Sequence, residues 1–364
     1  LASYNHDTNE LILLSIPRDF HVQVNPDEVW YNRINSVYST YEQQEEEEGL
    51  LRLRDVVTEV TGQEIQYHGM IDYNGFTELI DTLGGIEINV ENSFTDYRYP
   101  DNSRYKTVSF TEGPQTMDGK TSLEYSRSRH SLQNSEGSDF ARARRQQEVI
   151  SSLTNKLTST SLLNPQSLMN VFNVIQDNVK ISKFDLNEVE AGITELKEFK
   201  ENGEIYSFVL DPNAGAGKLV STLSLDSGAY AIGPINGLGN YTDIKKYISN
   251  IWDNPPLYEE DPIIRIYNTG LGYTPTLEEY NKLVEEFPYL KIYYVGTLYT
   301  DKENVITYIN AEEGFQDSFE SLNKYIEPDL TQKPEYITTN LNGEDITVLY
   351  GNKPENEVNV EQPE

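Results

Sequence analysis

The order of hydrophobic and polar positions predicts strands and helices that follow one another along the chain. Residues 11–16 form a continuous apolar run, which has the length of a strand buried on both faces. Apolar residues between 50 and 60 recur at helical spacing, and Gly62 is a suitable residue to end that helix. Apolar and polar residues alternate between 86 and 90, as in a half-buried strand. These elements predict an α/β fold.

Three further helices and one polar stretch are predicted after the first strands. Asn74 can cap a short helix, which a pair of glycines follows. Residues 92–107 are polar and rich in tyrosine, and they predict a loop or a hairpin. A short helix begins at Thr116 or Asp118, and Asp139 can cap a long helix. The first part of the chain thus keeps the mixture of strands and helices of an α/β domain.

The second half of the chain predicts a domain boundary. Residues 253–261 are rich in proline, aspartate and asparagine, and we interpret them as a linker. It separates a first domain, residues 1–252, from a second, residues 262–351. The second domain is predicted to contain strand, helix, strand, strand, helix and strand, the βαββαβ order of a small split-βαβ sandwich. Residues 352–364 are polar and acidic, and we predict that they are disordered.

Composition excludes several classes of function. The chain has 364 residues with 28 basic and 60 acidic side chains, a balance that disfavours nucleic acid and anionic lipid as surface partners. It has no cysteine, which excludes disulfides, thiolate metal sites and cysteine nucleophiles. No apolar run approaches the roughly 18 residues that a membrane-spanning helix needs. Leu1 lies in a β-like segment and no signal peptide is visible, so we expect that the N-terminus has been cut.

Arginine is concentrated in one short window of this acidic protein. Five of the twelve arginines lie between residues 127 and 145, although the net charge of the chain is −32. They are Arg127, Arg129, Arg142, Arg144 and Arg145. The guanidinium group donates two parallel hydrogen bonds and stays charged, which suits a compact anion such as phosphate. The alternative is a solvated basic helix with exposed arginines.

The spacing of these arginines predicts that they converge. Arg142, Arg145 and Gln146 are spaced i, i+3, i+4 and project from one face of the long helix. Arg142 lies in the first turn, where a purely structural helix would carry an acid, so an anion is expected at that helix end. Arg127 and Arg129 face the same side if the chain is extended there. We predict that Arg127, Arg129, Arg142 and Gln146 converge on one pocket, together with Arg18 at the end of a strand.

Two further charged residues follow the apolar strand. Arg18 and Asp19 come directly after it, where open α/β sheets place their ligand sites. Asp19 is an ion-pair partner, a turn residue or a metal ligand. The four histidines are not spaced as a metal site, and Ser15 lacks the sequence context of a serine hydrolase. The chain has neither a Walker loop nor the glycine pattern of a dinucleotide-binding fold.

A set of short motifs occurs in order over residues 1–250. They are Ser15-Ile16-Pro17-Arg18-Asp19, Arg33-Ile34-Asn35, Ile71-Asp72-Tyr73-Asn74-Gly75-Phe76, Tyr125-Ser126-Arg127-Ser128-Arg129-His130 and Asp139-Phe140-Ala141-Arg142-Ala143-Arg144-Arg145-Gln146-Gln147. In this order they resemble the LytR-CpsA-Psr family of cell-envelope proteins. Residues 262–351 are similar to the LytR C-terminal domain. The resemblance implies an α-β-α sandwich around a central mixed sheet, on the outer face of the cell membrane.

The same resemblance implies a glycopolymer phosphotransferase that depends on Mg²⁺, or alternatively Mn²⁺. Such enzymes move a polymer, for example a teichoic acid or capsule, from a polyprenyl-pyrophosphate carrier to peptidoglycan and release polyprenyl phosphate. The implied pyrophosphate ligands are Arg18, Arg33, Arg127, Arg129, Arg142, Arg145 and Gln146. The implied catalytic residues are Arg18, Asp19, Arg129 and Arg142, and Asp19 is also the implied metal ligand.

The resemblance further implies a membrane anchor, a strand and an aspartate-containing motif upstream of residue 1. Two other functions remain open at this point. The first is a module that binds lipid-linked wall polymer without turnover. The second is a transcriptional attenuator, a name attached to some relatives, which the acidic composition and the lack of a DNA-reading helix oppose.

Overall fold

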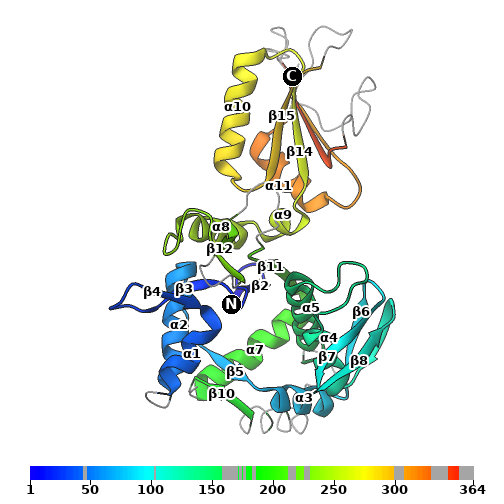
Figure 1. Cartoon of the computed structure of the whole chain (residues 1–364). Helices are drawn as coiled ribbons and strands as arrows, with labels where there is room; N and C mark the ends of the chain where they lie inside the picture. The colour runs from blue at the N-terminus through cyan, green and yellow to red at the C-terminus, as the bar shows by residue number, and fades with distance from the viewer. Residues whose placement is uncertain are drawn as a thin grey trace. The chain divides into compact units, whose positions relative to one another are not determined.

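Figure 1 shows the computed structural model of the chain. It describes residues 1–43, 47–101, 104–157, 171, 174, 178–182, 186–211, 219–224, 230–298, 307–328 and 343–351. The described residues divide into two compact units: residues 1–211, 220–224 and 230–241 belong to the first, and Leu219 and the described residues from Thr242 onward belong to the second. The predicted disordered tail, residues 352–364, lies outside the described residues.

The first unit contains a mixed three-stranded sheet. Its middle strand, β2 (Glu10–Ser15), pairs antiparallel with β1 (Ala2–Asn5) and parallel with β11 (Glu204–Val209). Ile12, Leu13 and Leu14 are all buried, which confirms the prediction of a strand covered on both faces. The carboxyl end of β2 leads directly to Arg18 and Asp19.

Two helices and a hairpin follow β2. Strands β3 (His21–Asn25) and β4 (Trp30–Arg33) pair antiparallel, and α1 (Ile34–Glu42) packs against α2 (Glu48–Thr61). Gly62 ends α2 in the left-handed region at φ 73°, as its sequence position predicts. Val56 and Val60 on α2 are buried, whereas Leu53 and Val57 are only partly covered. One side of α2 therefore packs in the core, and the side that carries Leu53 and Val57 is only partly buried.

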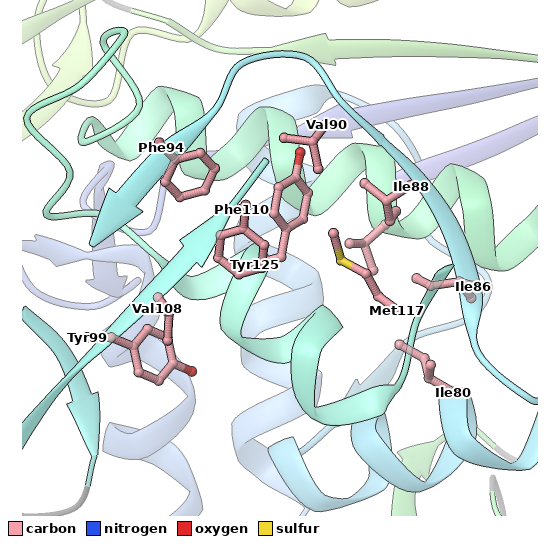
Figure 2. Close-up of a cluster of buried hydrophobic side chains, with 11 residues drawn as sticks. Ile80, Ile86, Ile88, Val90, Phe94, Tyr99, Val108, Phe110, Met117 and Tyr125 are labelled. Atoms are coloured by element: carbon pink, nitrogen blue, oxygen red, sulfur yellow. The ribbon is translucent and has the colours of Figure 1, made fainter. Parts of the chain in front are cut away.

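Buried side chains between Ile80 and Val149 form a second core of the first unit. Strands β7 (Phe94–Asp101) and β8 (Arg104–Phe110) pair antiparallel as a hairpin, one of the two forms predicted for this part of the chain. Strand β6 (Ile86–Val90), which the sequence pattern predicted, pairs with β9 (Gly113–Met117). The pattern did not predict β9. Figure 2 shows the rings of Phe94, Phe110 and Tyr125 gathered on one side of this core.

Three helices cover this core. Asp118 caps α4 (Gly119–Arg127) by accepting a hydrogen bond from the Thr121 N–H at 2.7 Å. Helix α5 (Asp139–Leu157) is the predicted long helix. Helix α3 (Tyr73–Thr82) is capped by Asp72 rather than by the predicted Asn74, because the Asp72 carboxylate accepts from the Gly75 N–H at 2.8 Å.

The second unit contains the predicted βαββαβ order. The elements are β14 (Ile263–Asn268), α10 (Tyr273–Glu286), β15 (Lys291–Thr297), β16 (Tyr308–Ala311), α11 (Gln316–Ile326) and β17 (Ile346–Tyr350). The strands form one sheet in the order β15-β14-β17-β16. Parallel pairs join β14 to both neighbours, and β16 pairs antiparallel with β17.

The predicted linker is instead largely helical. Helix α8 (Thr242–Asp253) is followed at once by α9 (Pro255–Glu260), in which Pro255 occupies the first turn. Proline suits this position because its missing N–H would have no partner within the helix. Leu257 and Tyr258 of α9 are buried, so residues 253–261 form a packed part of the second unit and not an exposed connection. Among the described residues, no helix combines the length and the apolar character needed to span a membrane.

Candidate functional site

A single cavity gathers most of the predicted anion-binding side chains. It has a volume of about 700 Å³ and is lined by Arg18, Arg127, Arg129, Arg142 and Gln146. Arg18 follows β2, and Arg127 and Arg129 lie at the end of α4 and just after it. Arg142 and Gln146 lie in the first half of α5. The predicted convergence on one pocket is confirmed as a matter of geometry, while the role of each side chain in binding stays a prediction.

The rest of the cavity wall is largely apolar. Leu53 and Val57 come from α2, Ile150 comes from α5, and Leu13 and Leu14 come from β2. The structure assigns the apolar wall to α2 and α5, whereas α3 contributes its first residue, a tyrosine. In Figure 1, α2 lies on one side of the first unit and α4, α5 and β7 lie on the other, so the cavity extends between these groups.

Arg127 is held at the cavity by aromatic rings. Its guanidinium lies 4.0 Å from the centre of the Tyr73 ring and donates a hydrogen bond of 3.4 Å to the Tyr99 hydroxyl. Arg127 belongs to the last turn of α4, so the chain is not extended there as the sequence interpretation assumed. Ser128 leaves the helix with an extended backbone, and Arg129 reaches the same cavity by this route.

Asp96, which no sequence motif singled out, is a fully buried carboxylate on β7. Its Oδ2 accepts hydrogen bonds from the Ser128 hydroxyl at 2.7 Å, the Arg129 N–H at 3.0 Å and the His130 N–H at 3.2 Å. Its Oδ1 accepts from the Arg98 N–H at 2.8 Å. Burial acts to raise the pKa of Asp96, but these hydrogen bonds outweigh burial and lower the pKa. Alternation with the buried Phe94 was the signal that could have placed this acid on the core face of a strand.

Arg145 does not line the cavity, contrary to its predicted role as a pyrophosphate ligand. Its side chain is 1% exposed, and its guanidinium donates to the Tyr125 carbonyl at 3.0 Å, to the Ser128 carbonyl and to the Glu136 carboxylate. It also lies 4.7 Å from the centre of the Phe94 ring. Burial lowers the pKa of Arg145, and the Glu136 carboxylate opposes this effect. The buried Glu136 carboxylate and the carbonyls of Tyr125 and Ser128 thus hold the Arg145 side chain in the core and away from the cavity.

Gln146 is the neighbour of Arg145 that does face the cavity. Its side-chain amide donates to the Ser126 carbonyl at 3.4 Å, which links α5 to the last turn of α4. The predicted face of α5 is therefore divided: Arg142 and Gln146 line the cavity, and Arg145 points into the core.

Asp19 and Arg33 form an ion-pair network beside the cavity. Asp19 is 6% exposed, and its two oxygens lie 3.3 Å from the Arg18 Nε and 3.2 Å from the Arg33 Nε. Arg33 also donates to the Tyr230 carbonyl at 3.3 Å. Arg18 lines the cavity, whereas Asp19 and Arg33 do not, although the family resemblance implied that Arg33 is a pyrophosphate ligand. The ion-pair role that the sequence left open for Asp19 is present in the structure.

The surroundings of Asp19 fit a divalent cation only in part. Its Oδ1 accepts no hydrogen bond of good geometry, although the Arg33 guanidinium is close. Among the described residues, no three or more histidine, cysteine or acidic side chains form a group that could hold a metal. Mg²⁺ binds through as few as one or two carboxylates when phosphate oxygens and water complete its shell. Asp19 alone is compatible with this mode.

Comparison with known proteins supplies relatives that act in the cell wall. Polyisoprenyl-teichoic acid–peptidoglycan teichoic acid transferase TagU of Bacillus licheniformis is 27% identical over 195 residues, 53% of this chain and 56% of TagU. Cell wall biosynthesis protein LcpA of Corynebacterium glutamicum is 27% identical over 198 residues, 49% of this chain and 36% of LcpA. The chain thus spans about half of TagU and about a third of LcpA.

A solved structure and a family model complete the comparison. The crystal structure of Bacillus subtilis TagV matches with a TM-score of 0.51 at 21% identity, covering 69% of this chain and 87% of TagV, which supports the fold alone. The model of the LytR_cpsA_psr family matches residues 1–205, which include every arginine of the cavity. On this match and on the motifs that line the cavity, the chain belongs to the LytR_cpsA_psr family.

Proposed function

We propose that this chain is a phosphotransferase that attaches a glycopolymer from a polyprenyl-pyrophosphate carrier to peptidoglycan. One observation carries the proposal: four arginines and an apolar wall share one cavity. A polyprenyl pyrophosphate is complementary to such a cavity, because it joins two adjacent, negatively charged phosphates to a long hydrocarbon chain. The names of TagU and LcpA, a teichoic acid transferase and a cell wall biosynthesis protein, support the same reaction class.

Positioning and charge neutralisation are the contributions that phosphoryl transfer requires from a protein. Arg18, Arg127, Arg129 and Arg142 would bind the non-bridging oxygens of the two phosphates, and Leu53 and Val57 would contact the hydrocarbon chain. An acceptor hydroxyl then attacks the phosphorus that carries the polymer. A new P–O bond forms, the bond from that phosphorus to the bridging oxygen breaks, and polyprenyl phosphate leaves. The hydroxyl proton passes to solvent or to a base.

Arg127 has a defined part in this reaction. The Tyr73 and Tyr99 rings support its guanidinium, so fewer of its rotamers remain to be fixed when substrate binds. When bound beside Asp19, Mg²⁺ would neutralise additional phosphate charge. Asp19 itself keeps Arg18 and Arg33 in place through its two oxygens.

The acceptor, polymer and location belong to the same proposal. We infer that the acceptor is a peptidoglycan hydroxyl, that the donor is a polyprenyl-linked wall polymer, and that the protein acts on the outer face of the cell membrane. The excess of acidic residues supports a carbohydrate or lipid-linked partner over nucleic acid.

Release of polyprenyl phosphate tests the proposal directly. The protein is incubated with a polyprenyl-pyrophosphate-linked disaccharide, peptidoglycan fragments and Mg²⁺, and the released lipid is measured by mass spectrometry. Release that requires the acceptor supports transfer. Retention of the lipid without release would instead support a binding module, and strong binding of duplex DNA at moderate salt would support an attenuator.

Asp19→Asn is expected to raise the Mg²⁺ concentration needed for half-maximal rate by at least about 10-fold. The amide keeps the shape of the side chain but removes the anionic oxygen that Mg²⁺ prefers. The rate is measured over a series of Mg²⁺ concentrations, with Asp27→Asn as the control, because Asp27 is an exposed acid in a turn outside the cavity. An unchanged half-maximal concentration in Asp19→Asn would leave Asp19 as an ion-pair partner only.

A further inference from the structure

The Ser128–His130 segment is held from two directions by buried charges. It follows α4 without regular secondary structure, and only the Ser128 N–H of this segment is shown to donate back into the helix, to the Glu124 carbonyl at 3.1 Å. The N–H groups of Arg129 and His130 donate to the Asp96 carboxylate, and the Ser128 carbonyl accepts from the Arg145 guanidinium. Polar backbone groups that lose water need such partners, so the two buried charges determine the conformation of this segment.

Both buried charges depend on the same strand. Phe94 and Asp96 lie two residues apart on β7, and the Phe94 ring lies beneath the Arg145 guanidinium. Figure 2 places Phe94 beside Tyr125, whose carbonyl also accepts from Arg145. The position of β7 therefore places both Asp96, which accepts the N–H groups, and Phe94, whose ring contacts the Arg145 guanidinium.

The position of this segment matters because Arg129 carries its side chain to the cavity. Arg18, Arg127 and Arg142 line the same wall, and like charges repel before substrate arrives. A flexible segment would let Arg129 turn away into water. A backbone fixed by buried hydrogen bonds keeps the guanidinium in place without the substrate.

We propose that Asp96 is a positioning residue that fixes the Ser128–His130 segment and thereby directs Arg129 into the cavity. The inference rests on the proposed function of that cavity and assigns Asp96 no contact with substrate. A carboxylate suits this role because three donors converge on Oδ2 and a fourth reaches Oδ1. An amide has one acceptor oxygen, so Asp96→Asn would set an NH₂ group against at least one of these donors.

Amide hydrogen exchange tests the fixed conformation without any ligand. We expect Asp96→Asn to speed exchange in the peptide that contains residues 126–132 by about 10-fold or more relative to the parent. Ser128→Ala removes one of the four hydrogen bonds and is expected to give a smaller change of the same sign, so the test survives if Asp96→Asn fails to fold. Asp118→Asn is the matched control, because Asp118 also accepts a backbone N–H but caps the far end of α4. Unchanged exchange in folded Asp96→Asn would overturn the proposal.

A double-mutant cycle tests whether Asp96 acts through Arg129. Inorganic pyrophosphate is titrated into the parent, Asp96→Asn, Arg129→Ala and the double variant by calorimetry. Each single variant is expected to weaken binding by about 10-fold or more, and Asp96→Asn is expected to add less than about 2-fold once Arg129 is gone. Independent, additive losses would show that Asp96 acts in another way. Failure of the parent to bind pyrophosphate would count against the proposed function, and the exchange result alone would then decide the positioning role.

Discussion

Arg129→Ala and Arg142→Ala are each expected to lower the rate of polymer transfer by about 100- to 1000-fold, with little change in the thermal midpoint of unfolding. Both side chains line the cavity, where a charge-assisted contact to the transition state contributes roughly 2.7–4 kcal/mol. Their removal also relieves repulsion among the neighbouring arginines, so the fold should not weaken. Transfer is measured as release of polyprenyl phosphate, and unfolding is followed by calorimetry.

Arg54→Ala serves as the control for loss of one positive charge. Arg54 lies on α2, pairs with the adjacent Asp55 and does not line the cavity. It is expected to keep the transfer rate of the parent. If Arg129→Ala and Arg142→Ala both unfolded at a much lower temperature than the parent, these arginines would be structural residues, and their assignment as substrate ligands would be wrong.

Arg145→Ala is expected to lower the free energy of unfolding by about 3–5 kcal/mol, a larger loss than any cavity arginine should give. The substitution leaves the Glu136 carboxylate buried without its main partner and leaves the Tyr125 and Ser128 carbonyls without a donor. It also removes the cation that lies on the Phe94 ring. Urea unfolding followed by circular dichroism measures the loss.

The adjacent residue provides the matched control for this prediction. Arg144 pairs with the same Glu136 and with Glu91, but its side chain is 52% exposed. Arg144→Ala is expected to change the free energy of unfolding by about 1 kcal/mol or less, as exposed ion pairs do. A fully stable Arg145→Ala protein that had lost transfer activity would restore Arg145 to the role of a substrate ligand, as the sequence spacing suggested.

Several features of this protein followed from the sequence because they depend on local pattern. The apolar run 11–16 predicted a strand covered on both faces, and β2 is buried as expected. The βαββαβ order of the second unit followed from short segments of alternating and helical periodicity. The convergence of Arg127, Arg129 and Arg142 followed from helix spacing and from family motifs that occur in order.

The local sequence pattern did not decide the structure where the same residues are compatible with two different conformations. Residues 253–261 carry the prolines and acids of a linker, yet Pro255 in a first turn is equally compatible with a helix, and burial of Leu257 and Tyr258 favours α9. Asp72 and Asn74 are both good capping residues, and the backbone geometry of the turn selects Asp72.

Only the tertiary structure separated Arg145 from Arg142 and Gln146. Helical spacing places all three on one face, but that face meets both the cavity and the core. The carboxylate of Glu136 and the carbonyls of Tyr125 and Ser128 come from other segments and draw Arg145 inward. Asp96 escaped notice for the same reason, because its partners lie more than 30 residues away along the chain except for Arg98. Spacing along one element reports where a side chain can point, whereas the charges and carbonyls packed against that element determine where it does.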